Sequence, residues 1–522
     1  MLRSGRAHCP ASSSGWQSRR NESIPEPDPA SLTKPAQLML VKYRGRGLPH
    51  IGSMKPASHR VDFDPALMAR YDVAAPRYTS YPTAPQFRDD FGEVRYRDAI
   101  RVSNEVASPR PLSLYVHMPF CWSPCFYCGC NRIITHDKGR ADRYLQRVYR
   151  EVERVAPLFD ARRPVRQLHL GGGTPNFLDA DRLRQLLDVL KAHFAFGTDD
   201  EGVEAGIEID PRFTDAEYVR ELGAMGFNRI SIGVQDFDPR VQAAVNRLQT
   251  PEETRVAVDA AREAGFASVN IDLIYGLPRQ SPAGFLTTLH RVIGLAPDRL
   301  AVYGYAHLPH LFKAQGQIDS ADLPDAAMRV RLFGLALETL CDAGYVYVGM
   351  DHFARPGDDL VRAQAEGTLQ RNFQGYSTRG DCDIVGLGVS AIGRIRNTYS
   401  QNVRDLAGYA LALDNDRLPV ARGIALDRDD IIRRAAIGEL MCHGRLDFHA
   451  FGERHGIVFA DYFADAWPRL RRLEADGLLE LSGQALCPTP RGRLLLRVIA
   501  MCFDAYLADE TPASRPRHAR SL

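Results

Sequence analysis

Three cysteines within one short segment constrain this chain more than any other feature. Cys121, Cys125 and Cys128 follow an apolar run and are spaced C-x-x-x-C-x-x-C in VHMPFCWSPCFYCGCNRIIT. Three thiolates packed this closely can ligate three irons of one cubane iron–sulfur cluster, which leaves the fourth iron open to another ligand. Chance explains the spacing poorly, because only 10 of the 522 residues are cysteine.

A structural zinc site is the main alternative for this loop. Zinc usually takes its remaining ligands from a second cysteine or histidine pair at some distance. Cys130 lies nearby, but ligation by both ends of a Cys-Gly-Cys sequence is cramped. Disulfides are not expected in a chain of this composition without a secretory signal. We interpret the scattered cysteines as buried thiols: Cys9, Cys341, Cys382, Cys442, Cys487 and Cys502.

The composition is that of an ordinary soluble globular protein. Hydrophobic residues make up 45% of the chain, charged residues 25%, and the formal net charge is +2. This net charge gives no sign of a nucleic-acid partner, and no apolar stretch approaches the roughly eighteen residues that span a bilayer. We therefore expect a cytoplasmic monomer with neither a nucleic-acid nor a membrane partner.

The first 53 residues differ from the rest of the chain. They are rich in Ser, Arg and Pro and lack periodic apolar positions, which predicts a disordered extension. They fit a transit peptide only loosely, and translation from Met54 would remove them. Beyond them we expect an N-terminal arm at 54–111, a barrel at 112–375, a C-terminal domain at 376–510 and a tail at 511–522.

Between about Leu112 and His307, short β-rich apolar runs alternate with amphipathic helical segments. The runs are SLYVHMPF, VRQLHLGGG, VEAGIEID, RISIGVQ, SVNIDLIYG and RLAVYGYAH, and YVYVGMDHFA extends the sheet. This alternation predicts an α/β fold with a parallel sheet and crossover helices. Six units in roughly 200 residues suit an open (β/α)6 partial barrel better than a full eight-unit barrel.

The unusual residues fall where these strands end, which is where the chemistry of such barrels lies. The cysteine loop follows the first strand, and the turn GGGTP (171–175) follows the second. Glu208 and Asp210 end the third strand, Gln235 ends the fourth, and Asp272 lies in the fifth. The pattern predicts one composite site.

Several of these residues also have ordinary structural readings. A glycine turn before a helix can hold an anion or can be a plain connection. Glu208 could accept a hydrogen bond from a ligand or be a surface or capping acid, as most acidic residues are. Asp272, flanked by apolar residues, needs a partner, which could be a ligand or a structural donor. Arg247 could pair with a carboxylate or be solvated.

The region after about Gly375 is mostly helical. Amphipathic helices are indicated at 427–442, 461–477 and 491–507, with a short hairpin in GLLELSGQALCPTPRGR. This outline is winged-helix-like. Such a unit could cap the open barrel, and the net charge gives no support to a nucleic-acid role.

The cysteine spacing, with Tyr127 directly before the third cysteine, and the glycine turn resemble those of the radical S-adenosylmethionine (SAM) enzymes. From about Val61 to Leu507 the chain resembles the oxygen-independent coproporphyrinogen III oxidases. The matching stretches are PRYTSYPTA, LYVHMPFCWSPCFYCGCN, LHLGGGTP, FNRISIGVQDF, NIDLIYGLP, YAHLP, GMDHFARP, RNFQGYSTRGDCDIVGLGVSAIG and MCFDAYL. The related haem chaperones generally lack the counterpart of Cys130 and the FQGY-type segment, which ranks the oxidase above them.

The resemblance implies a [4Fe-4S] cluster bound by Cys121, Cys125 and Cys128, with Cys130 outside the ligand set. It also implies two SAM molecules next to each other. Positions that contact the cluster-bound SAM match Tyr115, Gly172, Glu208 and Ile392, with Tyr127 against the cluster or this SAM and Tyr115 the candidate catalytic residue. Positions around the second SAM match Gly173, Thr174, Gln235, Arg247, Asp272 and Ala306.

The reaction implied by the resemblance is the oxidative decarboxylation of two propionates of coproporphyrinogen III to vinyl groups, which gives protoporphyrinogen IX in haem biosynthesis. A SAM-derived 5′-deoxyadenosyl radical removes the hydrogen, and an electron donor and an acceptor of unknown identity take part. The alternatives are a haem chaperone of the same superfamily and another radical SAM enzyme.

Overall fold

The computed structural model describes residues 61–197, 202–509 and 520–521. The predictions for residues 1–53 and for most of the tail therefore lie outside the described residues. Within them, none of the helices combines the length and the apolar character needed to cross a membrane.

Six parallel strands form the centre of the main sheet. β1 (Leu112–Met118) pairs with β4 (Val165–Gly172), and the order continues through β5 (Glu204–Ile209), β6 (Arg229–Gln235), β7 (Ser268–Tyr275) and β8 (Arg299–Gly304). Every neighbouring pair in this series is parallel. The predicted open arrangement of six strand–helix units is confirmed.

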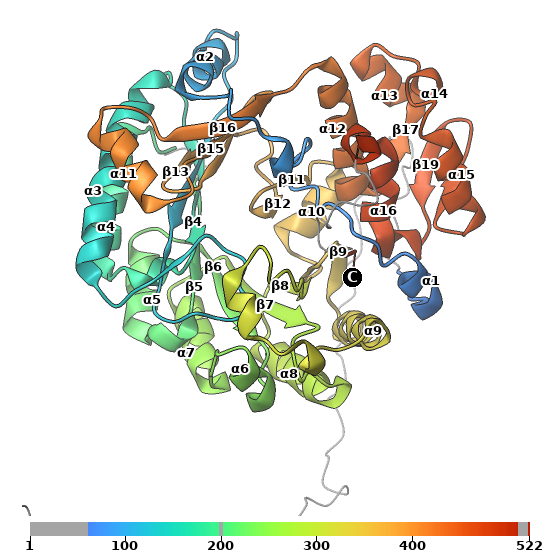
Figure 1. Cartoon of the computed structure of the whole chain (residues 1–522), viewed down its shortest axis with the longest axis horizontal. Helices are drawn as coiled ribbons and strands as arrows, with labels where there is room; N and C mark the ends of the chain where they lie inside the picture. The colour runs from blue at the N-terminus through green and yellow to red at the C-terminus, as the bar shows by residue number, and fades with distance from the viewer. Residues whose placement is uncertain (1–60, 198–201, 510–519, 522) are drawn as a thin grey trace, which may run out of the picture. The chain divides into compact units, whose positions relative to one another are not determined.

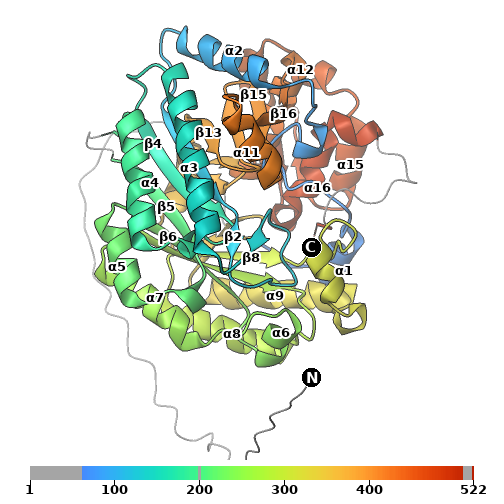
Figure 2. The same cartoon turned by 60° about the vertical axis from the view of Figure 1, so that its left-hand side comes forward.

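Helices cover the outer face of this sheet, as Figures 1 and 2 show. They are α3 (Lys138–Val155), α4 (Ala180–His193), α5 (Ala216–Ala224), α7 (Pro251–Glu263) and α8 (Pro282–Leu295), with the short α6 (Pro239–Ala244) after β6. Capping residues stabilise the first turns of these helices. Asp179 accepts a hydrogen bond from the Arg182 N–H in α4, and Thr250 and Glu253 form a capping box in α7. β1 is buried on both faces, as expected for a strand covered by helices on one side and by the interior on the other.

The sheet continues beyond the six strands at both edges, to 12 strands in all. On the β1 side it adds β13 (Asp383–Leu387), β14 (Ile392–Ile395), β15 (Thr398–Asn402) and β16 (Val420–Ala425). β13 is parallel to β1, with Leu112 opposite Asp383. The main sheet therefore includes strands that lie after residue 375, where we expect the barrel region to end, because the open edge of β1 is paired by a strand that comes much later in the chain.

At the other edge, the run at 345–354 forms two strands and not one. β9 (Val346–Gly349) and β10 (His352–Ala354) are antiparallel to each other, and β10 is antiparallel to β8. The chain reverses at Gly349 and Met350, which have φ angles of 150° and 55°. Positive φ at two successive residues turns the backbone, which the apolar pattern of the run does not reveal.

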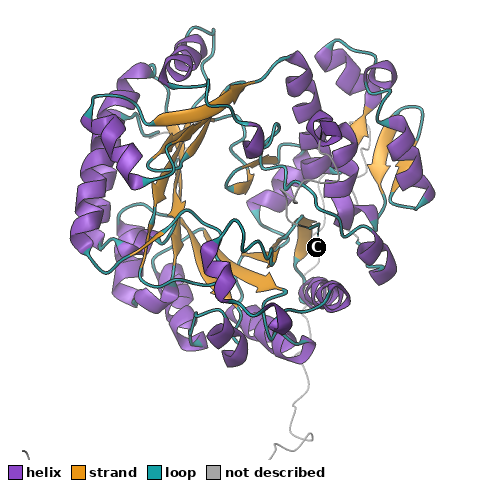
Figure 3. Ribbon diagram, viewed as in Figure 1, coloured by secondary structure: helices purple, strands orange, loops and turns teal. Residues whose placement is uncertain are grey.

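The C-terminal region is helical with one small sheet, drawn in purple and orange in Figure 3. It comprises α12 (Arg428–His443), α13 (Phe448–His455), α14 (Phe459–Tyr462), α15 (Trp467–Ala475) and α16 (Leu496–Ala500), with antiparallel strands β17 (Leu446–Asp447), β18 (Leu479–Leu481) and β19 (Ala485–Pro488). The hairpin predicted at 477–493 is present as β18 and β19. The helix predicted at 491–507 is instead broken into α16 and short 3₁₀ turns on either side.

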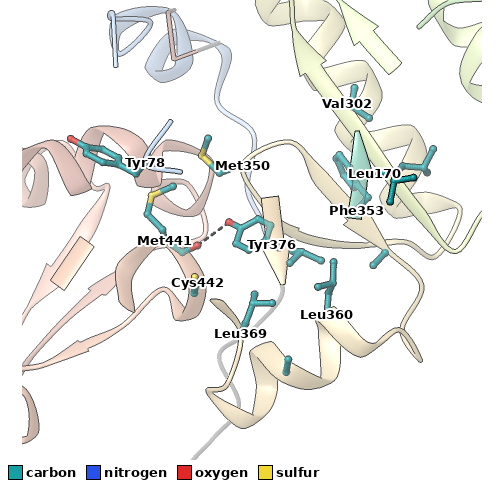
Figure 4. Packing of buried hydrophobic residues seen from close by; sticks show 14 of the residues in the cluster. Tyr78, Leu170, Val302, Met350, Phe353, Leu360, Leu369, Tyr376, Met441 and Cys442 are labelled. Carbon is teal, nitrogen blue, oxygen red and sulfur yellow. Dashed lines mark hydrogen bonds between the residues drawn. The ribbon is translucent and has the colours of Figure 1, made fainter. Parts of the chain in front are cut away.

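The remaining elements join these parts. They are α1 (Pro65–Arg70), α2 (Glu93–Asn104), α9 (Ala326–Asp342), α10 (Asp359–Glu366), α11 (Leu406–Asp414), and the hairpin of β11 (Gln370–Asn372) and β12 (Gly375–Ser377). Figure 4 shows the hairpin against α12, where the Tyr376 hydroxyl donates to the Met441 carbonyl at 2.9 Å. A buried tyrosine that finds a carbonyl acceptor fixes the hairpin on the C-terminal region.

A buried carboxylate on α3 ties this helix to the segment around β14. Glu151 is 1% exposed. It accepts hydrogen bonds from the Gly388 N–H at 2.7 Å, the Asn402 side-chain amide at 2.6 Å and the Tyr409 hydroxyl at 2.5 Å. Burial raises the pKa of Glu151 to about 7, although these hydrogen bonds act in the opposite direction.

This raised pKa predicts a pH-dependent stability. The folded protein holds the Glu151 proton more tightly than the unfolded chain, so the free energy of unfolding should fall as pH rises from about 4.5 to about 7. A shift of this size corresponds to roughly 3 kcal/mol at full extent. Glu151→Gln has no carboxyl group to titrate at this position. Between about pH 5 and 8 its free energy of unfolding, measured in urea, should therefore fall by about 2–3 kcal/mol less than that of the wild type.

The matched control is Glu153→Gln, since Glu153 lies on the same helix but is exposed. This variant should follow the wild-type pH profile. Parallel profiles for the wild type and Glu151→Gln would contradict the prediction.

Candidate active site

The cysteine loop begins directly after β1. Cys121 ends the short strand β2 (Phe120–Cys121), which pairs with β3 (Ile133–Ile134) and closes the loop at its base. Cys121 and Cys125 are each 8% exposed, and Cys128 is half-buried. All three line one cavity of about 180 Å³. Three thiols that line a common cavity from one loop fit the donor set that a cubane cluster requires.

The glycine turn lies against this loop through backbone hydrogen bonds. The Gly173 N–H donates to the Met118 carbonyl at 2.7 Å, and the Thr174 N–H donates to the Phe120 carbonyl at 2.9 Å. The Thr174 hydroxyl lies 3.3 Å from Cys121 Sγ. At Gly172, φ is 118° and an added Cβ would lie 2.5 Å from the His117 ring. Only glycine fits there without strain, which explains one glycine of the motif physically.

Cys130 lies beside Cys128 in a supporting position. Its backbone N–H lies 3.4 Å from Cys128 Sγ. Hydrogen bonding from Cys130, with the Arg132 charge close by, lowers the pKa of the Cys128 thiol to about 6. Arg132 also donates to the carbonyls of Cys128 and Cys125 at 2.9 and 3.1 Å. These donors favour the thiolate form of Cys128, the form that binds metal.

Glu208 faces the cavity from the end of β5. His169 Nε2 donates to its Oε1 at 3.2 Å, and the Gly172 N–H donates to its Oε2 at 3.2 Å. Burial alone would raise the pKa of Glu208, but these hydrogen bonds outweigh it and the pKa is lowered. The side chain is 44% exposed and opens into the cavities that it lines. An anionic carboxylate is thus available to a ligand.

Asp210 gathers two arginines beside Cys125. It pairs with Arg212 at 2.7 Å and with Arg247 at 2.9 Å. Arg212 Nη2 and Arg247 Nη1 lie 3.7 and 3.6 Å from Cys125 Sγ. Arg247 is 7% exposed in its side chain, so the solvated alternative considered for it does not hold. The sequence reading did not single out Arg212.

Gln235 and Asp272 also line the cavity of the cysteines. Gln235 has a φ of 70°, a strained conformation for a side chain of this size. Asp272 accepts from Asn270 at 2.8 Å and from Ser231 at 3.1 Å, which is the structural partner considered from the sequence. Burial and then the Glu208 charge raise the pKa of Asp272 to about 6. Its carboxylate is therefore held by structural donors and also lines the cavity.

Tyr115 and Ile392 line a second cavity of about 380 Å³ that shares Glu208 and Gly172 with the first. The Tyr115 hydroxyl lies 3.1 Å from His117 Nδ1, and His117 Nε2 lies 2.9 Å from the Asn131 carbonyl. Because a carbonyl only accepts, His117 donates through Nε2 to Asn131 and accepts a hydrogen bond from the Tyr115 hydroxyl at Nδ1. His117 and His169 were missed by the sequence reading, although both lie on strands that it identified.

Tyr127 and Ala306 are joined by one side chain. The Gln315 amide donates to the Tyr127 carbonyl at 2.9 Å and to the Ala306 carbonyl at 3.1 Å. Tyr127 lines the cavity of the cysteines. Ala306 follows β8 and does not line this cavity. Gln315 was not singled out from the sequence, because a glutamine in a loop carries no motif.

Comparison with known proteins agrees with this geometry. A family model of the radical SAM superfamily matches residues 115–292, and a model of the HemN C-terminal domain matches residues 426–495. The chain is 50% identical over 462 residues to the oxygen-independent coproporphyrinogen III oxidase of Pseudomonas aeruginosa, covering 88% of this chain and 99% of that protein. For the Escherichia coli protein of the same name, identity is 48% over 451 residues, covering 86% and 97%.

A solved structure is also similar. It is described as "Coproporphyrinogen III oxidase (HemN) from Escherichia coli is a Radical SAM enzyme", with a TM-score of 0.81 and 47% identity. The match covers 86% of this chain and 100% of that chain.

The partial barrel and the three-cysteine loop thus define a radical SAM protein, a class that uses a [4Fe-4S] cluster and SAM. Within that class, the chain belongs to the oxygen-independent coproporphyrinogen III oxidase family. Family membership favours an iron–sulfur cluster over the zinc alternative for the cysteine loop.

The geometry predicts which cysteines are needed for iron. Cys121→Ala, Cys125→Ala and Cys128→Ala should each abolish the cluster after anaerobic reconstitution, whereas Cys130→Ser should keep most of about four irons per chain. The reason is that Cys130 offers its backbone N–H to Cys128, and serine retains that group. Iron and acid-labile sulfide assays measure the outcome. Equal iron loss from Cys130→Ser would contradict a three-ligand site.

Proposed function

We propose that this chain converts two propionate side chains of coproporphyrinogen III to vinyl groups by oxidative decarboxylation, giving protoporphyrinogen IX. The observation that carries the proposal is the convergence on one cavity of Cys121, Cys125, Cys128, the glycine turn and Glu208, in a chain of this family. The relatives named above are oxidases, which favours this activity over a haem chaperone. The cytoplasm is the proposed compartment, and the proposed state is a monomer.

The cluster and SAM, when bound, supply the one-electron cleavage that yields a 5′-deoxyadenosyl radical. The residues of the chain bind and orient the cluster and SAM. Cys121, Cys125 and Cys128 would hold the cluster, while Tyr115, Gly172, Glu208 and Ile392, with Tyr127 nearby, would hold a SAM molecule beside it. Glu208 suits the positively charged ammonium of SAM, because His169 and the Gly172 N–H keep its carboxylate anionic.

A second SAM would lie against Gly173, Thr174, Gln235, Arg247, Asp272 and Ala306. Five of these six residues line the cavity of the cysteines, which supports the assignment. Arg247 is held by Asp210 and by the Gly233 carbonyl at 2.6 Å, so its guanidinium is fixed in place. Ala306 could contribute only from the rim, through the backbone that Gln315 holds.

The substrate needs a cavity that is large enough to hold it and shielded from water. The cavity of about 380 Å³ lined by Tyr115, His117 and Ile392 adjoins the cysteine cavity and suits part of a tetrapyrrole. In each half-reaction a hydrogen atom leaves the propionate β-carbon, CO₂ leaves, and one electron passes to an external acceptor. Buried walls protect so reactive a radical from water and from other groups.

The test is anaerobic turnover with a low-potential donor and an electron acceptor. Protoporphyrinogen IX, CO₂ and 5′-deoxyadenosine should appear together, with two CO₂ per product. Turnover of SAM to 5′-deoxyadenosine with a different organic product would point to another radical SAM enzyme. Haem transfer without decarboxylation would refute the proposal in favour of a chaperone.

The second SAM site has its own test. Asp272→Ala should keep the iron content and the cluster spectrum, yet lose at least about tenfold in vinyl product, because an acid in the cofactor cavity is removed. Equilibrium dialysis should show close to one bound SAM per chain in place of two. Asp322→Ala, at an acid in a short 3₁₀ helix outside these cavities, is the control. Unchanged SAM stoichiometry and product yield in Asp272→Ala would overturn the assignment.

A further inference from the structure

The tripeptide Asp-Pro-Arg occurs twice after neighbouring strands, at 210–212 and at 238–240. In both copies the aspartate accepts the arginine backbone N–H, at 3.2 Å in the first and 2.9 Å in the second. Both guanidinium groups also fold back onto the same aspartate, with Nη2–Oδ2 distances of 2.7 and 2.8 Å. This shared geometry is a local device for starting a helical turn.

The two arginines differ in what surrounds them. The Arg240 side chain is 68% exposed, whereas that of Arg212 is 10% exposed. Arg212 Nη2 also reaches to 3.7 Å from Cys125 Sγ. The local turn therefore accounts fully for Arg240 but leaves the contact of Arg212 with a cluster-binding cysteine unexplained.

The charge beside Cys125 is not balanced by the protein alone. Arg212 and Arg247 both pair with Asp210 Oδ2, at 2.7 and 2.9 Å, so two cations share one carboxylate. Asp210 is itself held in place, since Asn176 accepts its backbone N–H and donates to its carbonyl, each at 2.9 Å. One positive charge remains for the Cys125 sulfur.

The other two ligand cysteines have neutral donors among the described residues. Cys121 Sγ is approached by the Thr174 hydroxyl, and Cys128 Sγ by the Cys130 N–H. Cys125 is thus the thiolate with charge-assisted donors, which are stronger than neutral ones. Among the three ligand cysteines, Cys125 is therefore the one whose sulfur is approached by guanidinium groups.

We propose that Arg212 raises the reduction potential of the cluster through Cys125, and so eases the electron transfer that starts turnover. The inference rests on the cluster of the proposed function and adds a positioning residue to it. Reduction takes one electron from a low-potential one-electron donor and adds one negative charge to the cluster and its thiolates. Hydrogen bonds to sulfur and a nearby cation stabilise that added charge.

The experiment uses the full chain, reconstituted anaerobically without SAM, so that SAM binding does not enter. Arg212→Met removes the charge and the donors at similar length. Arg240→Met makes the same change in the second Asp-Pro-Arg copy and is the matched control. Arg247 is unsuitable, because it is also a proposed SAM contact. Iron content and an EPR-monitored redox titration with dithionite or titanium(III) citrate are the readouts.

Arg212→Met should retain the cluster and make its reduction at least tenfold less favourable, a fall of about 59 mV for one electron. Arg240→Met should leave the potential unchanged. Arg212→Lys keeps a cation but lacks the planar fork of donors, so it should show a smaller fall. A stronger reductant offsets a lower cluster potential. At saturating SAM, the activity of Arg212→Met should therefore be closer to that of the wild type with titanium(III) citrate than with a weaker electron donor.

An Arg212→Met protein with full iron and the wild-type potential would overturn the inference. If Arg212→Met does not hold iron, Arg212→Lys decides, and a wild-type potential in that variant overturns it equally. Failure of the proposed function would look different. The wild type would then make no vinyl product, whatever the potentials of the variants.

Discussion

Two backbone hydrogen bonds between neighbouring strand ends hold the site together. Gly173 and Thr174, directly after β4, donate to the carbonyls of Met118, the last residue of β1, and Phe120 in β2. A Cβ at Gly173 would lie 2.7 Å from the Pro119 carbonyl carbon, so this approach needs glycine. Because β1 and β4 are parallel neighbours, their loops emerge at the same edge of the sheet. The pairing places Thr174 on Cys121, and with it the cysteine loop over the end of β5.

A second set of anchors brings a distant segment to the same place. The Tyr144 hydroxyl on α3 donates to the His117 carbonyl at 2.6 Å and accepts from the Val389 N–H at 3.0 Å. Glu151, two turns further along the helix, holds Gly388. The segment that leads to Ile392 is thus fixed beside β1, where Ile392 and Tyr115 line one cavity. Helix α3 therefore holds both β1 and the segment around Gly388 in place.

Much of this arrangement could be predicted from the sequence. The six strand runs, the cysteine spacing and the glycine turn are local patterns, and local patterns are what a single sequence records. The partner of β13 could not be predicted, because the apolar pattern of residues 383–387 does not say which open strand edge will be paired. Gln315 was missed for a similar reason, since its two acceptors, Tyr127 and Ala306, come together only in the fold.

The two Asp-Pro-Arg copies make the same point more sharply. Their sequences and their local hydrogen bonds agree, and only tertiary packing separates Arg212 from Arg240. A sequence motif can therefore predict how a side chain is held without predicting what it touches. The resemblance to a family carried site residues such as Asp272 and Arg247 into the prediction, but the contact of Arg212 with Cys125 came only from the structure.

Glu208 lies where three cavities meet. It lines the cavity of the cysteines, the one beside Tyr115, and a third of about 160 Å³ deeper in the barrel. Hydrogen bonds from His169 and Gly172 hold it anionic, and its charge contributes to the raised pKa of Asp272. A fixed negative charge at this junction attracts cationic ligands and disfavours further carboxylates close by. Carboxylate groups of a substrate with several propionates would therefore be directed away from Glu208.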